Sequence, residues 1–217
     1  FNKVQLTVTG DALVPESALV VCNHQSLADY FFMTLLAERC PGGLVPQVSF
    51  FTWYSVWRVP TVRTLLNVVL CDENWELSSL LCRSAFSPVR ASEAPQWVVL
   101  FPEVNIWTPS AAYQQRLQAK KYCLPYYDHT LYPRYPGLLN AVGTLGNRTN
   151  IKFARVYNLT ILYHSRKPPS LLQLFASTEK IAVTIDVRAM RLSSIPHRKA
   201  KLERWLEKTW LDKDRQL

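Results

Sequence analysis

The chain has 217 residues, 48% of them hydrophobic and only 19% charged, which is enough to bury the core of one domain. This composition excludes an intrinsically disordered chain, and 6 glycines exclude a collagen-like or glycine-rich one. The formal net charge of +9 arises entirely within residues 101–217. A basic half attracts phosphates on lipid headgroups, nucleic acid or a phosphorylated cofactor. The alternative is that its cations lie on solvated helix faces.

Five scattered cysteines, odd in number and never spaced as C-x-x-C, argue against a disulfide framework or a zinc ribbon. They favour reduced thiols that face the cytosol. No apolar run reaches the roughly 18 to 20 residues that a membrane-spanning helix needs. Because the chain begins at Phe1 without a signal-peptide pattern, we expect it to be part of a longer protein.

Short β-type runs alternate with longer helical stretches, with no repeat or linker between them, so we expect one domain over residues 1–217. The runs ALVVC, NVVLC and WVVL are continuously apolar, as strands buried on both faces are. This pattern predicts an α/β fold with a mixed, largely buried β-sheet flanked by helices. The predicted strands are Val4–Thr9, Ala18–Cys22, Asn67–Cys71, Trp97–Leu100, His129–Tyr132, Val156–Tyr163 and Ile181–Arg188. The predicted helices are Ser26–Arg39, Glu76–Ser84, Ser110–Tyr122, Gly137–Leu145 and His197–Asp212.

Residues 48–60 carry five aromatic side chains close together, followed by Arg58 and Pro60. Tyr and Trp favour a membrane interface because each has an apolar body and a polar tip. Two interpretations stay open, since part of this segment belongs in the core and part would suit a membrane surface. The aromatic residues are Phe50, Phe51, Trp53, Tyr54 and Trp57.

The predicted C-terminal helix is amphipathic, with lysines and arginines between its apolar positions. The simpler interpretation is a helix docked on the core; the alternative is a helix that lies on a membrane surface. The apolar positions are Leu202, Trp205, Leu206, Trp210 and Leu211.

Four polar signatures each follow directly after a predicted apolar strand. In open α/β sheets the active site lies at the carboxyl ends of the strands, where loops enter helices. We therefore expect one His, several carboxylates and an Arg to meet at a single edge of the sheet. The signatures are Asn23–His24, Asp72–Glu73, Pro102–Glu103 and Pro133–Arg134.

His24 and Asp29 stand five residues apart in the segment NHQSLAD. Two helical positions at that spacing are rotated by roughly 140°, so they pair only if His24 lies in the turn before a helix that begins near Ser26. Asp29 would then accept a hydrogen bond from one imidazole nitrogen and leave the other free as a base. No G-x-S-x-G segment supplies a nucleophile, so the pair would activate a hydroxyl of the substrate. The alternative is a structural His beside an Asp that stabilises the helix.

ALVVCNHQSLADY, followed by PQWVVLFPEVNIWTP and TLYPRYPG, resembles the 1-acyl-glycerol-3-phosphate acyltransferase family of lysophospholipid acyltransferases. RVPTVRTLLNVVLCDENWEL resembles the block between the first and third motifs of that family. RVYNLTILY and RLSSIPHRKAKLERWLEKTWLDKD are similar to later segments of the branch that acts on lysocardiolipin and lysophosphatidylinositol. The resemblance covers nearly the whole chain, in the family's order.

The resemblance implies that His24 is the general base that removes the proton from the free glycerol hydroxyl of a lysophospholipid. Asp29 would orient and charge that His. The hydroxyl would attack the thioester carbon of an acyl-CoA, giving a diacyl phospholipid and free CoA. Acyl-CoA is then a co-substrate, and neither a bound cofactor nor a metal ion is expected.

The substrate-binding positions implied by the same motifs are Asn23, Pro102, Glu103 and Arg134. The motif that contains Glu103 is linked to acceptor binding and site architecture; alternatively, Glu103 is a strand-end carboxylate that caps the next helix. The planar donors of Arg134 suit a phosphate; alternatively, Arg134 is a surface residue without a ligand.

The expected partners are membrane phospholipids, a lysophospholipid acceptor and acyl-CoA, and no nucleic acid; the oligomeric state stays open. The expected location is the cytosolic face of a membrane, that of the endoplasmic reticulum in the first place or of mitochondria or another organelle. The flanking membrane segments would lie outside this chain.

Two departures from the family pattern concern the acceptor. Val104 and Asn105 stand where the family usually has Gly and Thr, and Val opposes backbone conformations that Gly permits. Glu73 stands where an Arg is expected to contact the acceptor phosphate, with Arg58, Arg63 and Arg83 as candidates to compensate. These departures motivate one alternative, a non-catalytic lipid-binding protein of the same fold; a CoA-independent phospholipid transacylase is a further alternative.

Overall fold

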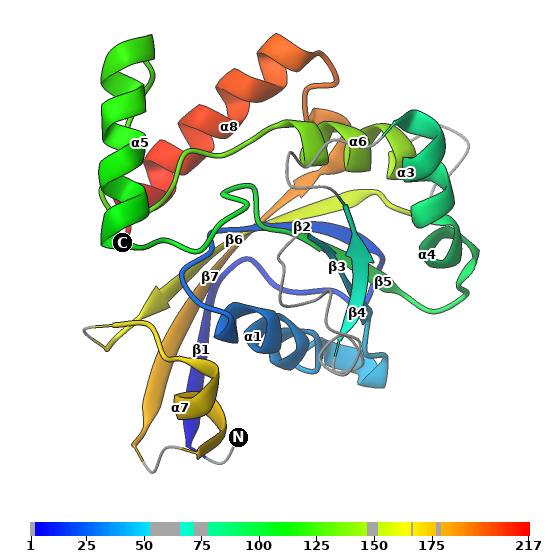
Figure 1. The fold of residues 1–217 in the computed structure, drawn as a ribbon. Coiled ribbons are helices and arrows are strands. Elements are labelled where there is room, and N and C mark those ends of the chain that lie inside the picture. Colours follow the sequence, from blue (N-terminus) through cyan, green and yellow to red (C-terminus); the bar gives the residue numbers. More distant parts are fainter. Residues whose placement is uncertain (1–2, 53–65, 72–77, 147–151, 166, 177–178) are drawn as a thin grey trace.

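One seven-stranded mixed sheet organises the molecule, with the strand order β1-β7-β6-β2-β5-β3-β4 (Figure 1). The computed structural model describes residues 3–52, 66–71, 78–146, 152–165, 167–176 and 179–217. The strands are β1 (Val4–Gly10), β2 (Ala18–Cys22), β3 (Gln47–Thr52), β4 (Asn67–Leu70), β5 (Gln96–Leu100), β6 (Arg155–Tyr163) and β7 (Ile181–Arg191).

The central strand β2 lies between β5 and β6 and is parallel to both. The strand β3 is in turn parallel to β5 and β4. Only the β6–β7 pair is antiparallel, and β1 runs parallel to β7. Five neighbouring strands from β6 to β4 therefore end at the same edge of the sheet, where a site of an open α/β fold forms.

Helices cover both faces of this sheet (Figure 1). The helix α1 (Ala28–Ala37) and the short α7 (Leu171–Ala176) lie on one face, and α3 (Ser79–Ala85), α6 (Pro136–Leu145) and α8 (Lys199–Asp214) lie on the other. The helix α4 (Ser87–Ala91) follows α3, and α5 (Pro109–Tyr122) stands beside the sheet. The 3₁₀ turns among the described residues are Pro41–Gly43 and Leu192–Ser194.

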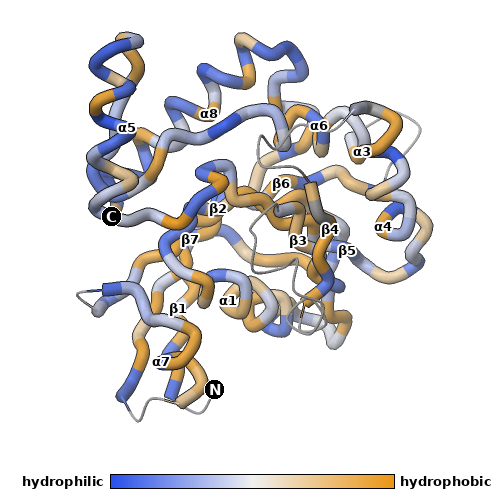
Figure 2. The backbone as a smooth tube through the Cα atoms, in the orientation of Figure 1, coloured by the Kyte–Doolittle hydropathy of each residue, from blue (hydrophilic) through white to orange (hydrophobic). Residues whose placement is uncertain are grey.

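Both faces of the central strands are buried in apolar cores. In β5, Trp97 and Val99 pack into the core under α1, whereas Val98 and Leu100 pack into the core under α6 and α8. In Figure 2 the hydrophobic colour is concentrated along the central strands, whereas α5 and α8 carry hydrophilic and hydrophobic residues in alternation. The continuously apolar strands in the sequence are thus explained, and the predicted fold class is confirmed.

Six of the seven predicted strands are present, but the strand predicted at His129–Tyr132 is wrong. The N–H groups of Asp128, His129 and Thr130 donate to the carboxylate of Asp214 at 2.7–2.9 Å, so they are not available to a neighbouring strand. The strand that prediction missed is β3, which lies within the aromatic segment. Apolar content alone does not distinguish a strand from a segment whose backbone bonds to side chains.

The five predicted helices are present, with α1 shorter at both ends than Ser26–Arg39 and α8 extended to Asp214. In α8, Leu202, Leu206 and Trp210 are buried against the sheet, which confirms the docked interpretation of its apolar stripe. No described helix is long and apolar enough to cross a membrane.

The structure describes the first part of the aromatic segment. Phe50 and Phe51 lie in β3 and are buried in the cores on opposite faces of the sheet. Residues 53–60, with the other three aromatic side chains, Arg58 and Pro60, lie outside the described residues.

Candidate active site

The loop between β2 and α1 brings His24 and Asp29 together at the carboxyl edge of the sheet. The Nδ1 atom of His24 lies 2.9 Å from Oδ2 of Asp29, and both side chains are buried. The geometry is the one that the spacing requires, because His24 precedes the helix and Asp29 lies in its first turn. A carboxylate only accepts hydrogen bonds, so Nδ1 is the donor toward an ionised Asp29, and in a neutral imidazole Nε2 then keeps a free lone pair.

Asp29 is fixed by further donors. Its Oδ2 accepts the N–H groups of Gln25 and Ser26 at 2.7 and 2.9 Å, which closes the turn before α1. Its Oδ1 accepts the hydroxyl of Tyr163, at the end of β6. Burial, with the charge of Asp29, raises the pKa of Tyr163 well above its usual value, so the phenol remains a donor. The side chain of Asp29 is thereby held in one orientation.

The imidazole of His24 is held by ring contacts and leaves one nitrogen free. It stacks on Phe101 with ring centroids 4.3 Å apart and meets the edge of Tyr30 at 5.3 Å. Nε2 is buried and, among the described residues, has no hydrogen-bond partner. A buried nitrogen with a lone pair and no protein partner is suited to accept a proton from a substrate.

Glu103 connects three parts of the chain behind this pair. Its Oε1 accepts the backbone N–H of His24 at 3.0 Å and the indole N–H of Trp210 at 3.1 Å, and its Oε2 accepts the N–H of Leu131 at 2.8 Å. Burial raises the pKa of Glu103 to about 8, although the three N–H groups act in the opposite direction. All three of these contacts are with the protein.

Pro102 and Glu103 are the central residues of a turn that follows β5. The N–H of Val104 closes it on the carbonyl of Phe101 at 2.9 Å, and Pro is favoured at the first central position of such turns. Val104 itself has φ of +66°, in the left-handed region that favours Gly, yet its side chain is buried. The Val that departs from the family pattern therefore adopts the backbone conformation for which a Gly is suited.

Asn23 is also engaged within the protein. Its side-chain amide donates to the carbonyl of Ile161 at 3.1 Å and accepts the N–H of the same residue at 2.8 Å. This pair of bonds prolongs the β2–β6 ladder by one residue, because Cys22 pairs with Leu159 in the last step of the sheet. Asn23 thereby fixes the start of the loop that carries His24.

Arg134 reaches the same edge although its segment is not a strand. Its N–H donates to the carbonyl of Pro102 at 2.7 Å. Its side chain is exposed and lines a pocket of about 90 Å³ with residues of α5 and of the segment that follows α5. Of the cations expected to compensate for Glu73, Arg83 lies exposed on α3. Residues 53–65 and 72–77, which include Asp72, Glu73, Arg58 and Arg63, lie outside the described residues.

Sequence reasoning missed two residues that hold the site, Tyr163 and Trp210. Tyr163 lies in a predicted strand and Trp210 in a predicted helix, where an aromatic side chain indicates no more than core packing. Their bonds to Asp29 and Glu103 span 134 and 107 residues of sequence. No local pattern signals contacts of that range.

The fold and the site define an α/β protein with a His oriented by a carboxylate, the arrangement that acyl-transfer enzymes use for a general base. The acyltransferase family model matches residues 5–142, more than half of the sequence, so the chain belongs to the acyltransferase family.

Known proteins similar to this chain agree with that assignment. It is 26% identical over its whole length to a probable 1-acyl-sn-glycerol-3-phosphate acyltransferase 5 of Arabidopsis thaliana, covering 57% of that protein. It is 24% identical over 99% of its length to lysocardiolipin acyltransferase 1 of Danio rerio, covering 55%. The chain thus spans about half the length of these relatives. The crystal structure of the 1-acyl-sn-glycerophosphate acyltransferase PlsC from Thermotoga maritima shares the fold, with a TM-score of 0.51 and 16% identity over 98% of this chain and 72% of that one.

The left-handed conformation of Val104 predicts an unusual order of stability. A non-glycine residue in this region costs about 1–2 kcal/mol, so Val104→Gly should be more stable than Val104→Ala by about 1 kcal/mol. Gly143, in α6, is the control, because a Cβ there meets nothing within 4 Å and Gly143→Ala should stabilise the helix. Urea unfolding measures all three variants. If Val104→Ala were more stable than Val104→Gly, the backbone at residue 104 would not be strained.

The raised pKa of Glu103 predicts a pH dependence of stability. The folded state binds this proton more tightly than the unfolded state, so the contribution is complete below pH 4.5 and is lost as the pH rises toward about 8. The free energy of unfolding should fall over pH 5–7.5, by at most about 1.4 kcal/mol per pH unit from this group. Glu103→Gln should flatten the slope, measured by urea unfolding at several pH values. Burial lowers the pKa of Lys213 to about 8. The protonation of Lys213 therefore differs between the folded and the unfolded state mainly above this pH range. Equal slopes in the two proteins would assign the dependence to other groups.

Proposed function

We propose that the chain transfers an acyl group from acyl-CoA to the free glycerol hydroxyl of a lysophospholipid, with His24 as general base and Asp29 as the carboxylate that orients it. The observation that carries the proposal is the buried His24–Asp29 hydrogen bond with Nε2 left free. The named relatives act on lysophosphatidic acid or lysocardiolipin by their titles, which supports a glycerolipid acceptor here.

The proposed reaction needs one proton-accepting group. Nε2 of His24 takes the proton of the acceptor hydroxyl as its oxygen attacks the thioester carbon, and the carboxylate of Asp29 stabilises the imidazolium that forms. The C–S bond then breaks, and the CoA sulfur leaves with the proton that His24 returns. Burial of the pair strengthens the electrostatic attraction between the imidazolium and the carboxylate.

We assign the remaining motif residues to two roles. Asn23, Pro102 and Glu103 fix the backbone around His24, since their polar groups bond to the protein. Arg134, exposed beside the pocket at α5, binds the phosphate of the acceptor, because a guanidinium matches a phosphate with two parallel donors. The same proposal includes acyl-CoA as the acyl donor and the endoplasmic reticulum as the location. The acceptor is lysophosphatidic acid, lysophosphatidylinositol or lysocardiolipin.

The first test is CoA release from oleoyl-CoA with a panel of these three lysophospholipids. We expect release with at least one acceptor and a loss of about 10²–10⁴-fold in His24→Ala, the usual contribution of a general base. His197→Ala, at an exposed histidine, is the matched control and should be unchanged.

Other outcomes would reject parts of the proposal. Activity of His24→Ala within a few-fold of wild type would exclude the assignment of the base. Acyl transfer from a diacyl phospholipid without CoA release would identify a transacylase. Binding of lysolipid with neither reaction would identify a lipid-binding protein, the alternative that Val104 and Glu73 raised.

The hydrogen bond from Tyr163 to Asp29 predicts that a substitution of Tyr163 lowers kcat without direct contact to the substrate. Tyr163→Phe removes the donor to Oδ1 of Asp29 and keeps the ring, so kcat should fall roughly tenfold while KM stays within about twofold, since only positioning is lost. Tyr157→Phe is the control, because that hydroxyl, on the same strand, accepts the N–H of Val14 instead. Both variants should lose about 1 kcal/mol of stability. Equal kcat values in the two variants would deny Tyr163 a role in positioning Asp29.

A further inference from the structure

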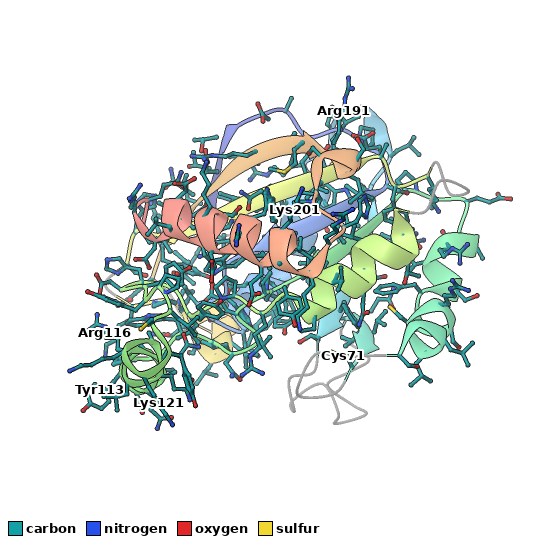
Figure 3. The ribbon with its side chains drawn as sticks, turned by 90° about the horizontal axis from the view of Figure 1, so that it is seen from above. Cys71, Tyr113, Arg116, Lys121, Arg191 and Lys201 are labelled. Carbon is teal, nitrogen blue, oxygen red and sulfur yellow. The ribbon has the colours of Figure 1, made fainter. Side chains whose placement is uncertain are left out.

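The helix α5 exposes an apolar and basic face that no other described element covers. Tyr113, Leu117, Lys120 and Lys121 follow at the spacing of one helix face, with Tyr113 63% and Leu117 54% exposed. The opposite face is anchored by small buried alanines. Figure 3, in which α5 is viewed end-on, shows Tyr113, Arg116 and Lys121 directed away from the body of the molecule.

The chain after α5 extends this surface. Leu124 and Tyr126 are 40% and 63% exposed, and Tyr122, at the end of the helix, is exposed as well. Large exposed apolar side chains are thus concentrated on α5 and the four residues after it. We call the outer face of α5 together with Leu124 and Tyr126 the α5 surface. An exposed patch of this kind on a folded domain usually marks an interaction site.

The charged residues of α5 itself are all basic. No Asp or Glu lies between Glu103 and Asp128 in the sequence. Arg116 forms an ion pair with Asp128, but within the described part of the chain no carboxylate pairs with Lys120 or Lys121. The ammonium of Lys121 lies 5.1 Å from the ring of Tyr122. The α5 surface therefore combines uncompensated positive charge with amphipathic side chains.

We propose that the α5 surface binds an anionic phospholipid bilayer. Tyr side chains bury a ring and keep the hydroxyl at the level of the headgroups, and Lys side chains bury their methylenes while the ammonium meets lipid phosphate. Each Lys near an anionic membrane strengthens binding about fivefold. A protein partner would call for a more apolar centre with fewer lysines. The inference concerns how the molecule meets a membrane and does not require the proposed chemistry.

The start of α5 lies close to the loop that carries His24. The helix begins after Thr108, whose hydroxyl caps it by accepting the N–H of Ala111 at 3.1 Å. The preceding residue, Trp107, donates its N–H to the carbonyl of His24 at 3.0 Å. A bilayer bound along α5 would therefore be connected by one short segment of backbone to the loop that carries the His24–Asp29 pair.

The test is co-sedimentation of the 217-residue chain with vesicles of phosphatidylcholine, with and without phosphatidylserine. Lys120→Gln with Lys121→Gln should weaken binding to the anionic vesicles roughly 30-fold, and Tyr113→Ala with Leu117→Ala roughly tenfold. The matched control is Lys201→Gln with Arg204→Gln, which removes the same charge from the exposed face of α8 and should change binding less than about threefold. All substituted residues are exposed, so the variants should keep the thermal stability of the wild type.

Each other outcome has a defined meaning. If the double variant at Lys120 and Lys121 and the double variant at Lys201 and Arg204 lost vesicle binding equally, net charge alone would explain the loss. That result would overturn the proposal. Unchanged binding in both α5 variants would overturn it as well, as would self-association of the chain that Tyr113→Ala with Leu117→Ala abolishes. Acyl transfer to a monomeric, short-chain lysophospholipid should be unchanged in the Lys120 and Lys121 variant. A wild-type chain that binds vesicles through α5 but transfers no acyl group would refute the proposed function alone.

Discussion

The candidate site depends on one buried carboxyl group, that of Glu103. A buried polar group is costly unless it is hydrogen-bonded, so Glu103 is stable there only while N–H groups surround it. Those groups come from the loop after β2, from the segment before α6, and from α8. Because these segments are brought together only by the tertiary fold, the backbone at His24 acquires its position when the sheet and α8 are both in place.

The C-terminal part of the chain completes this arrangement from outside the region that the family model matches. Tyr163 holds Asp29, Trp210 holds Glu103, and Asp214 holds the backbone of residues 128–130 that leads to Arg134. The motifs before residue 142 therefore supply the groups proposed to react, and β6 and α8 supply the groups that orient them. The resemblance of the segments that contain β6 and α8 to the family is thus explained by the side chains that they supply to the site.

The sequence predicted the features that depend on local pattern. The apolar runs located β2, β4 and β5, and the spacing of His24 and Asp29 required the turn that the structure contains. It failed where side chains from distant segments take over backbone bonds, as Asp214 does at the wrongly predicted strand. It also missed β3, since an aromatic run reads equally as core and as membrane contact. Contacts over more than 100 residues, such as that of Tyr163 with Asp29, depend on the order of strands in the sheet.

Val104 shows how a departure from a family pattern is accommodated. The left-handed conformation costs about 1–2 kcal/mol for a residue with a Cβ. Burial of the side chain in the core that α6 and α8 cover contributes about 1.5–3 kcal/mol in the opposite direction. The two terms offset each other, so the turn after β5 keeps the course that Glu103 needs without a Gly. Val104 is therefore compatible with an intact site, and it does not by itself favour a lipid-binding protein over an enzyme.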